Sequence, residues 1–411
     1  MHSNPYDDEK DIVLFLGRGI VMLTLIKNGE VFAPEYLGKK DLLIVNDKIG
    51  YILGGIGKPE GFVDIEVIDA AGKLIVPGFI DSHVHIIGGG GEGSYKTRTP
   101  ELQLTEATLA GVTTIVGVIG TDGTTRTMAG LIAKARGLEE EGITCFVQTG
   151  SYQVPVKTLT GKIEDDLILV DKIIGVGEIA IADHRSSQPT CEELAKIASA
   201  ARIGGMLSGK AGIVNVHVGD SKDHLKVIEQ VVEKTDVPIK QFYPTHINRN
   251  PHLFEAGIKF ALKGGYVDFT TSSIPKFLKE GEVKCSQALR RMLEAGVDIS
   301  RITYTSDAQA SLPDFDANGE LNGLKIGRIS SLYKEVRDSV LDEKIPLEVA
   351  LRVITQNPAA ILKLKNKGSI EPGKDADFVF LNKDTLEVDT VFAMGKMMTQ
   401  NGKAVVKGTF E

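Results

Sequence analysis

The middle of the chain, residues 73–364, alternates between short apolar runs rich in β-branched residues and stretches with helical periodicity. The helical stretches include PELQLTEATLAG, TCEELAKIASAARIGG and HLKVIEQVVEKT. The apolar runs number eight: LIVPGFIDSHVH, VTTIVGVIG, ITCFVQTGSY, IIGVGEIAIAD, GIVNVHV, FYPTHI, YVDFTTS and ITYTSD. Strands that alternate with helices in this way predict a (β/α)8 TIM-like barrel. A doubly wound open sheet is the alternative, but no GxGxxG motif opens a first helix to support it.

Both ends of the chain have a different pattern, in which short strand-like runs alternate with turn residues. IVLFL and DLLIVNDKIGYIL lie near the N-terminus, and GSIEPGKDADFVFLN and DTVFAMGKMMTQNGKAVVKG lie near the C-terminus. We predict that the two ends together form one small β-sandwich domain. Residues 1–72 would supply its N-terminal part and residues 365–411 its C-terminal part, with the barrel between them.

Composition and charge narrow the range of partners. A length of 411 residues fits a barrel of ~250 residues and a smaller domain. The net charge of −8 and the pI near 5.6 argue against a surface for nucleic acid or anionic membrane, because such surfaces need clustered Lys and Arg. The N-terminal segment MHSNPYDDEK lacks the features of a secretory signal, and no apolar run has the length of a spanning helix. A cytoplasmic protein that acts on a small molecule is the expectation.

Reactive side chains stand at the C-terminal ends of the predicted strands, where barrel active sites form. They are His83, His85, Tyr152, His217, His246 and Asp307. His83 and His85 are two residues apart on a strand, so both imidazoles can reach one ion. This pair alone is weak evidence, but five of the eight histidines lie at or just beyond strand ends. That distribution favours a metal site over histidines that are merely satisfied in a core.

Several motifs together resemble the amidohydrolase superfamily: PGFIDSHVH, a later histidine at a strand end, PTHINRN, and TSD near the last barrel strand. Within it, the chain is similar to the isoaspartyl dipeptidase family over nearly its full length. The similar segments are DSHVHIIGGGGEG, VGVIGTDG, ADHRSSQPT, GDSK, PTHINRN and GKAVVKGTFE. The resemblance implies two Zn²⁺ ions, although sites of this kind accept other divalent metals. His83, His85 and Asp307 would bind the more buried ion, and His217 and His246 the other.

Glu178 departs from the family pattern that we expect. It lies inside the apolar strand KIIGVGEIAIADHR, and alignment on DHRS places it where the bacterial relatives have a carbamylated lysine that bridges the metals. Glutamate offers a similar bidentate anion on a shorter stem. Two dications would offset the cost of burying this carboxylate, so we expect Glu178 to bridge the ions and activity not to require bicarbonate. The alternative is a salt bridge from Glu178 to Arg185 or another cation in the barrel.

The resemblance also implies roles for the remaining site residues. Asp307 would be the general base and then the general acid, and Tyr152 would stabilise the oxyanion. A loop with Gly90 and Gly91 carries Glu92, which would hold the amino group of the substrate. The other expected substrate contacts are Thr121 and Ser311, together with Arg185 and Arg249, whose guanidinium groups suit carboxylates. Each of these residues has a plainer alternative role. Asp307 could be a metal ligand without proton transfer, Tyr152 a packed side chain, and the glycine-rich loop a linker. Thr121 and Ser311 could be turn residues, and the two arginines could form structural ion pairs.

The sequence therefore predicts metal-dependent hydrolysis of the isopeptide bond of L-isoaspartyl dipeptides by a hydroxide that bridges the metals. The resemblance further implies a homo-oligomer, possibly an octamer. A dihydropyrimidinase-like enzyme or a deacetylase of the same superfamily is one alternative, because the metal residues would be shared. A non-catalytic assembly protein that keeps the barrel as a scaffold is another, although such proteins usually lose metal ligands.

Overall fold

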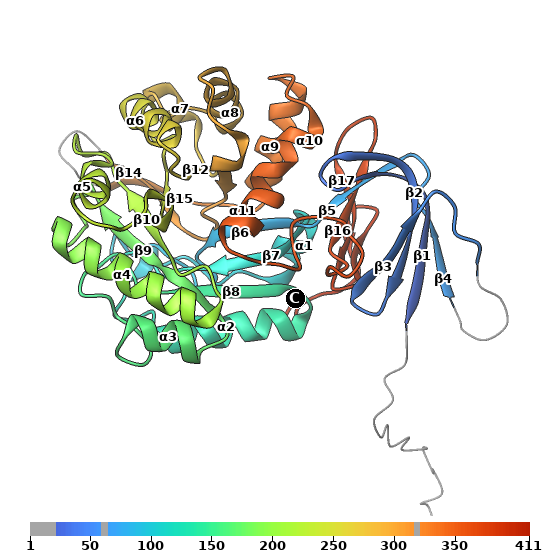
Figure 1. The fold of residues 1–411 in the computed structure, drawn as a ribbon, viewed down its shortest axis with the longest axis horizontal. Helices are drawn as coiled ribbons and strands as arrows, with labels where there is room; N and C mark the ends of the chain where they lie inside the picture. Colours follow the sequence, from blue (N-terminus) through green and yellow to red (C-terminus); the bar gives the residue numbers. More distant parts are fainter. Residues whose placement is uncertain (1–21, 59–64, 316–320) are drawn as a thin grey trace, which may run out of the picture.

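The computed structural model describes residues 22–58, 65–315 and 321–411, and these residues contain the predicted barrel (Figure 1). Its parallel strands are β6 (Phe79–Val84), β7 (Val112–Gly117), β8 (Thr144–Thr149), β9 (Ile173–Ile181), β10 (Ile213–Val218), β11 (Phe242–Thr245), β12 (Val267–Thr270) and β13 (Ile302–Thr305). Strands β6 to β11 form one sheet in chain order, and β12 pairs with β13. Strand β12 lies against β11, and β13 lies against β6, so the ring closes.

Helices surround the barrel (Figure 1). They are α1 (Leu104–Leu109), α2 (Met128–Glu141), α3 (Ile163–Leu169), α4 (Cys191–Ser208), α5 (Lys226–Lys234), α6 (Pro251–Leu262), α7 (Pro275–Glu280), α8 (Cys285–Glu294), α9 (Ser331–Leu341), α10 (Leu347–Ala350) and α11 (Gln356–Ile361). Short 3-10 helices are η1 (Tyr95–Thr97), η2 (Ile239–Gln241), η3 (Ile299–Arg301) and η4 (Leu351–Ile354). Local sequence explains several boundaries: Thr190 and Glu193 form a capping box before α4, and the left-handed Gly209 ends it.

The two ends of the chain meet in one mixed sheet beside the barrel (Figure 1). Its strands are β1 (Leu23–Phe32), β2 (Tyr36–Val45), β3 (Lys48–Leu53), β4 (Ile65–Asp69), β5 (Lys73–Pro77), β16 (Phe378–Asn382), β17 (Val388–Ala393), β18 (Lys396–Gln400) and β19 (Lys403–Ala404). The antiparallel pair β5 and β16 joins the N-terminal and C-terminal strands. Apolar residues from both ends, such as Ile26, Leu42 and Phe378, pack into one core. The predicted fold class is confirmed.

The run LIVPGFIDSHVH is divided between the two sheets. Strand β5 belongs to the sheet of the chain ends, and β6 begins the barrel just after Gly78. A Cβ at Gly78 would lie 2.3 Å from the Thr113 hydroxyl, so the crossing point needs a glycine. The expected boundaries at residues 72/73 and 364/365 stay predictions, and the predicted strand IVLFL lies outside the described residues. The hairpin of β14 (Ser311–Phe315) and β15 (Leu321–Ile326) follows the last barrel strand.

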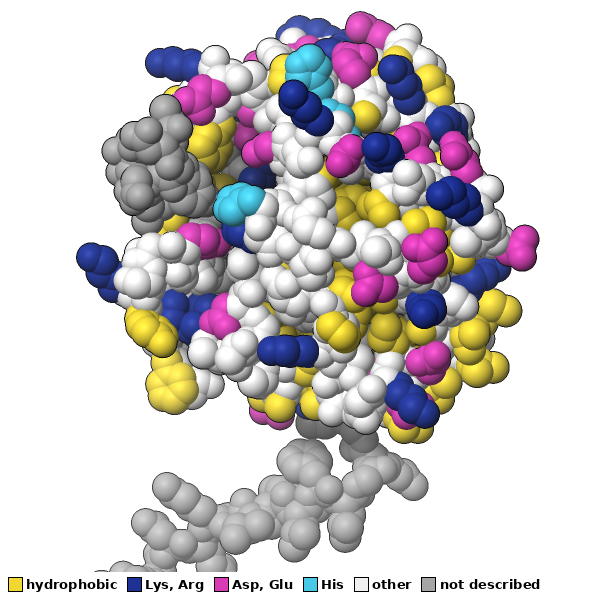
Figure 2. Space-filling view, turned by 90° about the vertical axis from the view of Figure 1, so that its left-hand side faces the viewer, with side chains coloured by type: hydrophobic (Ala, Val, Ile, Leu, Met, Phe, Trp, Pro, Cys, Tyr) yellow, Lys and Arg dark blue, Asp and Glu magenta, His cyan; other side chains and the backbone are white. Residues whose placement is uncertain are grey.

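The surface carries both signs of charge. In Figure 2, Lys and Arg side chains alternate with Asp and Glu side chains across the face that is shown, and they do not gather into one basic area there. In the described part of the chain, no helix combines the length and the apolar character that crossing a membrane requires.

Candidate active site

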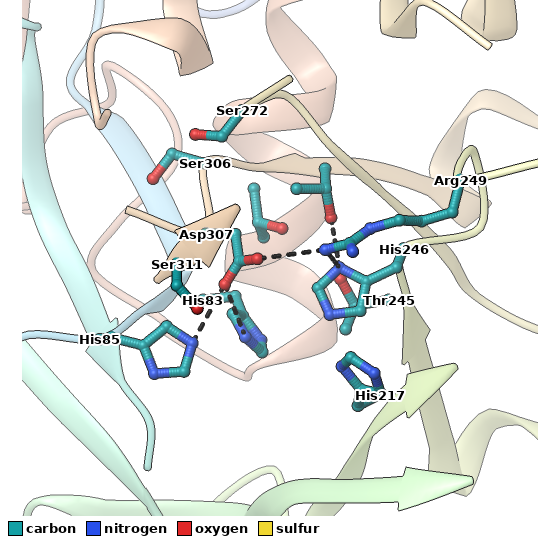
Figure 3. A network of polar contacts seen from close by, with 12 residues as sticks. His83, His85, His217, Thr245, His246, Arg249, Ser272, Ser306, Asp307 and Ser311 are labelled. Carbon is teal, nitrogen blue, oxygen red and sulfur yellow. Dashed lines mark hydrogen bonds and ion pairs between the residues drawn. The ribbon is translucent and has the colours of Figure 1, made fainter. Parts of the chain in front are cut away.

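The predicted metal ligands come together at the C-terminal ends of the barrel strands. His83 and Glu178 lie in β6 and β9, and His217 lies in β10. His85, His246 and Asp307 lie just beyond β6, β11 and β13 (Figure 3). All six side chains are buried, because each residue is at most 4% exposed. Six polar groups buried in one place need partners that offset their loss of water.

Glu178 lies between two pairs of histidines. Its Oε2 atom is 3.3 Å from Nε2 of His83 and 3.7 Å from Nε2 of His85. Its Oε1 atom is 2.8 Å from Nδ1 of His217 and 3.3 Å from Nε2 of His246. One carboxylate oxygen therefore faces each pair, as a bridging anion requires. Among the described residues, the partners of Arg185 are elsewhere, so the alternative salt bridge from Glu178 to Arg185 is not formed.

Asp307 completes the first pair (Figure 3). Its Oδ1 atom lies 3.1 Å from Nε2 of His85 and 3.6 Å from Nε2 of His83. Its Oδ2 atom lies 3.4 Å from the Arg249 guanidinium. The two carboxylate oxygens thus face different groups, one the histidines and the other a cation at the wall of the site.

The second ring nitrogen of each of three histidines is held by a hydrogen bond. Nδ1 of His83 is 3.0 Å from the Asn215 side-chain oxygen, and Nδ1 of His246 is 2.5 Å from the Thr270 hydroxyl. Nε2 of His217 is 2.9 Å from the Asp183 carboxylate. Partners of this kind fix the orientation of a metal-binding imidazole and the nitrogen that faces the ion.

The residues fit a pair of divalent ions. Nε2 of His83 and Oε2 of Glu178 are buried without a hydrogen bond, although they face one another. The donor atoms of the first pair and its carboxylates lie 3.1 to 3.7 Å apart, close to the ~3.3 Å expected for neighbouring ligands ~2.0 Å from a tetrahedral ion. Ligand atoms converge in two overlapping groups, His83 with His85 and Asp307, and His83 with Glu178 and His246.

The electrostatics of the site keep both carboxylates ionised. Burial alone would raise the pKa of Glu178, but the charge of His83 and the hydrogen bonds of His217 and His246 lower this pKa well below its ordinary value. The pKa of Asp307 is likewise lowered, mainly by its contact with His85 against the effect of burial. Burial and the nearby Arg249 lower the pKa of His246 to about 3, so this imidazole is neutral. The carboxylate of Glu178 raises the pKa of His83 to about 9 against the effect of burial. Because metals bind ionised carboxylates and neutral imidazoles, an ion at His83 would displace that proton.

A cavity of about 560 Å³ opens above these residues and contains the polar groups that we expect to contact a substrate. The Ser311 hydroxyl donates to Oε2 of Glu92 at 2.7 Å, and the Thr121 hydroxyl is 3.5 Å from Oε1 of the same residue. The Arg185 guanidinium lies 3.4 Å from that Oε1 atom. Three predicted substrate contacts from separate segments of the chain therefore meet at a fourth, Glu92.

The two arginines lie on different sides of the cavity, which both of them line. Arg185 stacks over the Tyr152 ring, with 5.4 Å from the guanidinium carbon to the ring centroid, whereas Arg249 faces Asp307 and His246. Gly90 lines this cavity, but Gly91 lines the neighbouring hollow instead. The loop needs glycine at residue 90, because its φ of +70° favours glycine and a Cβ there would lie 2.6 Å from the Thr97 carbonyl oxygen.

Tyr152 contacts one of the predicted metal ligands directly. Its hydroxyl is 2.9 Å from Nδ1 of His217. Burial, and then the charge of Glu178, raise the pKa of Tyr152 well above its ordinary value, so the hydroxyl keeps its proton and can donate it in a hydrogen bond.

Sequence reasoning missed the groups that hold the ligands. Asn215 lies two residues before His217, so both side chains point to the same side of β10, and that spacing was a usable signal. Asp183 follows β9 and contacts both His217 and Arg185. No local motif indicates this contact, because it depends on how two loops pack.

Comparison with known proteins places the chain among hydrolases of one superfamily. A model of the amidohydrolase family matches residues 74–398. Allantoinase from Bacillus licheniformis is 26% identical over 88% of this chain and 87% of its own. Adenine deaminase from Geobacillus kaustophilus is also 26% identical, over 93% of this chain, but the match spans only 58% of the deaminase.

A solved structure is much more similar. The crystal structure of beta-aspartyl dipeptidase from Fervidobacterium islandicum AW-1, in complex with the dipeptide beta-Asp-Leu, has a TM-score of 0.89 and 46% sequence identity. The match covers 94% of this chain and 98% of that one. A D-hydantoinase structure, with a TM-score of 0.66 and 20% identity, shows only that the fold is shared. The chain is thus a hydrolase of the amidohydrolase family, and within that family it belongs with the beta-aspartyl dipeptidases.

Proposed function

We propose that this protein hydrolyses the isopeptide bond of L-isoaspartyl dipeptides with two bound Zn²⁺ ions. The observation that carries the proposal is the meeting of Glu92 with Arg185 and Ser311 beside the ring of histidines and carboxylates. An isoaspartyl dipeptide has one ammonium and two carboxylates, and among the groups that line this cavity Glu92, Arg185 and Arg249 would match them. The 46% identity to a beta-aspartyl dipeptidase supports the same substrate class.

In this proposal His83, His85 and Asp307 hold one ion, His217 and His246 hold the other, and Glu178 binds both in place of a carbamylated lysine. When bound, two such ions lower the pKa of a shared water and polarise the scissile carbonyl. The position of the Glu178 oxygens between the two histidine pairs supports its bridging role.

Asp307 moves the protons. Because its pKa is lowered below its ordinary value, it is ionised and can accept a proton from the attacking water. The same carboxyl then donates that proton to the departing amine. The protonated Tyr152 hydroxyl donates to the carbonyl oxygen as negative charge builds on it.

The substrate is held by groups that do not take part in proton transfer. Glu92 binds the free ammonium, and Arg185 and Arg249 bind the two carboxylates. Thr121 and Ser311 contact Glu92 and fix its position beneath the bound ammonium. The backbone of Gly90 lines the cavity beside Glu92, and Gly91 lines the neighbouring hollow.

Other amidohydrolase activities remain the alternative, since the relatives include an allantoinase, adenine deaminases and dihydroorotases. The combination of Glu92 with two arginines favours a substrate with one ammonium and two carboxylates, as an isoaspartyl dipeptide has. The alternative of a non-catalytic scaffold loses support, because all six proposed ligands are present and converge. The homo-oligomer, possibly an octamer, stays a prediction that a mass measurement in solution tests.

The deciding experiment compares beta-aspartyl-leucine with alpha-aspartyl-leucine as substrates for zinc-reconstituted protein prepared without bicarbonate. We expect release of leucine from the beta-linked peptide alone. Glu178→Ala should lose this activity together with part of the bound zinc, whereas Glu139→Ala, which changes a carboxylate outside the site, should keep both. If neither peptide is cleaved by protein that holds two metals, the substrate assignment is wrong.

A further inference from the structure

Asp183 joins the two halves of the site through one oxygen atom. Its Oδ2 atom lies 2.9 Å from Nε2 of His217 and 2.8 Å from Nη2 of Arg185. Its Oδ1 atom accepts hydrogen bonds from the backbone N–H of Arg185 at 2.7 Å and from its Nε at 3.0 Å. A proposed metal ligand and a proposed carboxylate-binding guanidinium thus share a single carboxylate.

The fold holds this carboxylate in place. Asp183 is 9% exposed and follows Ala182, whose φ of +52° turns the chain sharply after β9. The backbone N–H of Gly219, just after β10, donates to the carbonyl of Ile181, and the N–H of Ser221 donates to that of Ala182. These two hydrogen bonds join the loop after β9 to the loop after β10.

Gly219 permits the close approach of these loops. A Cβ at residue 219 would lie 2.5 Å from the Ala182 carbonyl oxygen and 2.6 Å from Cβ of Asp183. Real Cβ atoms do not tolerate such distances, so the contact between Asp183 and His217 depends on this glycine.

Asp183 is ionised in this setting. Its two oxygens pair with the Arg185 guanidinium, Oδ1 with Nε at 3.0 Å and Oδ2 with Nη2 at 2.8 Å, and a carboxylate paired in this way with a cation keeps its charge. An anion that accepts the Nε2 proton of His217 leaves Nδ1 as the nitrogen that faces Glu178 and Tyr152. The same anion competes with the substrate for the Arg185 guanidinium.

We propose that Asp183 is a positioning residue that couples the metal half of the site to the substrate half, so that a carboxylate bound at Arg185 and an ion bound at His217 favour one another. This coupling rests on the proposed role of Arg185. A ligand carboxylate at Arg185 draws the guanidinium away from the shared oxygen. The Asp183 oxygen then accepts a stronger hydrogen bond from the His217 N–H, and this stronger bond makes Nδ1 a better metal ligand. By linkage, the ion must raise the affinity for the carboxylate by the same factor.

The test measures zinc affinity of the metal-free protein by competition with a chelator, with and without L-aspartate. L-aspartate carries the ammonium and the alpha-carboxylate of the isoaspartyl residue, and its beta-carboxylate takes the place of the scissile carbonyl, so it has no bond to cleave. Direct binding of that beta-carboxylate to an ion would persist in Asp183→Asn, so this variant separates it from the coupling. In wild-type protein we expect L-aspartate to tighten the second zinc equivalent by about fivefold or more. In Asp183→Asn we expect that equivalent to bind ~10 to 100-fold more weakly, with the first unchanged and the effect of L-aspartate lost. Asp171→Asn, which alters an exposed aspartate paired with Arg136, should behave as wild type.

Two results would overturn the coupling: no effect of L-aspartate on zinc affinity in wild-type protein, or an undiminished effect in folded Asp183→Asn. If Asp183→Asn does not fold, Gly219→Ala displaces the same carboxylate and should show the same two losses, and normal zinc affinity in that variant would refute the role. Failure of the proposed function looks different. Wild-type protein would then not cleave beta-aspartyl-leucine. The zinc affinities of the variants would still test whether the contact between Asp183 and His217 supports metal binding.

Discussion

At the scale of single residues, the site depends on carboxylates whose surroundings set their charge. Glu178 is ionised against the effect of burial because the charge of His83 and the hydrogen bonds of His217 and His246 lower its pKa. Asp268, deeper in the barrel, is held by hydroxyl groups instead. It is fully buried and accepts hydrogen bonds from the hydroxyls of Thr245, Thr303 and Thr305, each at 2.6 Å. Burial still raises the pKa of Asp268 from 3.8 to about 6.

The raised pKa of Asp268 predicts a dependence of stability on pH. Because the folded state holds this proton more tightly than the unfolded state, the contribution of Asp268 is full below pH 3.8 and is lost as the pH rises through about 6. We therefore expect the Tm of metal-free wild-type protein to fall, relative to that of Asp268→Asn, between about pH 4 and pH 7. Differential scanning calorimetry measures both.

Asp298 provides a control with the opposite sign. A backbone hydrogen bond from Ser300 lowers its pKa below the ordinary value of 3.8. The wild type should therefore gain stability relative to Asp298→Asn as the pH rises from about 2 to 4. A constant difference in Tm between wild type and Asp268→Asn across the whole pH range would contradict the raised pKa of Asp268.

Residues could be predicted from sequence where the strand pattern places them. His83, His85, His217, His246 and Asp307 each end a predicted strand, and the barrel rule alone brings them together. Glu178 needed the alignment on DHRS, because periodicity only shows a carboxylate in an apolar strand. The roles of Asp183 and Asp268 could not be predicted, because His217 and Thr245, which they contact, lie on other strands. Those contacts are set by packing rather than by neighbours in the sequence.

At the scale of elements, the sheet of the chain ends is tied to the barrel by a buried ion-pair network. The side chain of Lys367 is 5% exposed, and its ammonium lies 2.8 Å from Asp375 and 2.5 Å from Asp377. It also donates to the Thr144 hydroxyl at 2.6 Å, at the start of β8. Asp377 comes directly before β16, so one lysine connects both sheets. Sequence periodicity distinguishes helices from strands in this region, but it cannot show the contacts of Lys367. It also could not show that one apolar run contains both β5 and β6.

Removal of Lys367 should therefore destabilise the protein strongly. Lys367→Met leaves Asp377 buried without its cation, and we expect a loss of ~3 to 5 kcal/mol in the free energy of unfolding. Lys263→Met breaks an exposed pair with Glu229, in which the lysine is 57% exposed, and should cost at most ~1 kcal/mol. Urea denaturation compares the two variants, and equal losses would show that the buried network does not join the sheets.

At the scale of the whole molecule, the proposed ions would link strands from around the closed barrel. The ligands come from five strands or their ends, and His85 and Asp307, which face one another, are 222 residues apart in the sequence. Metal that binds only the folded chain stabilises it by ~2.7 kcal/mol at a free concentration one hundred times Kd. We expect chelation to lower the Tm and zinc to restore it, with a smaller zinc-dependent rise in Glu178→Ala and a full rise in Glu139→Ala. If neither the chelator nor zinc changes the Tm, the folded protein does not form a zinc site. The arrangement of four histidines around Glu178 would then have to hold another cation.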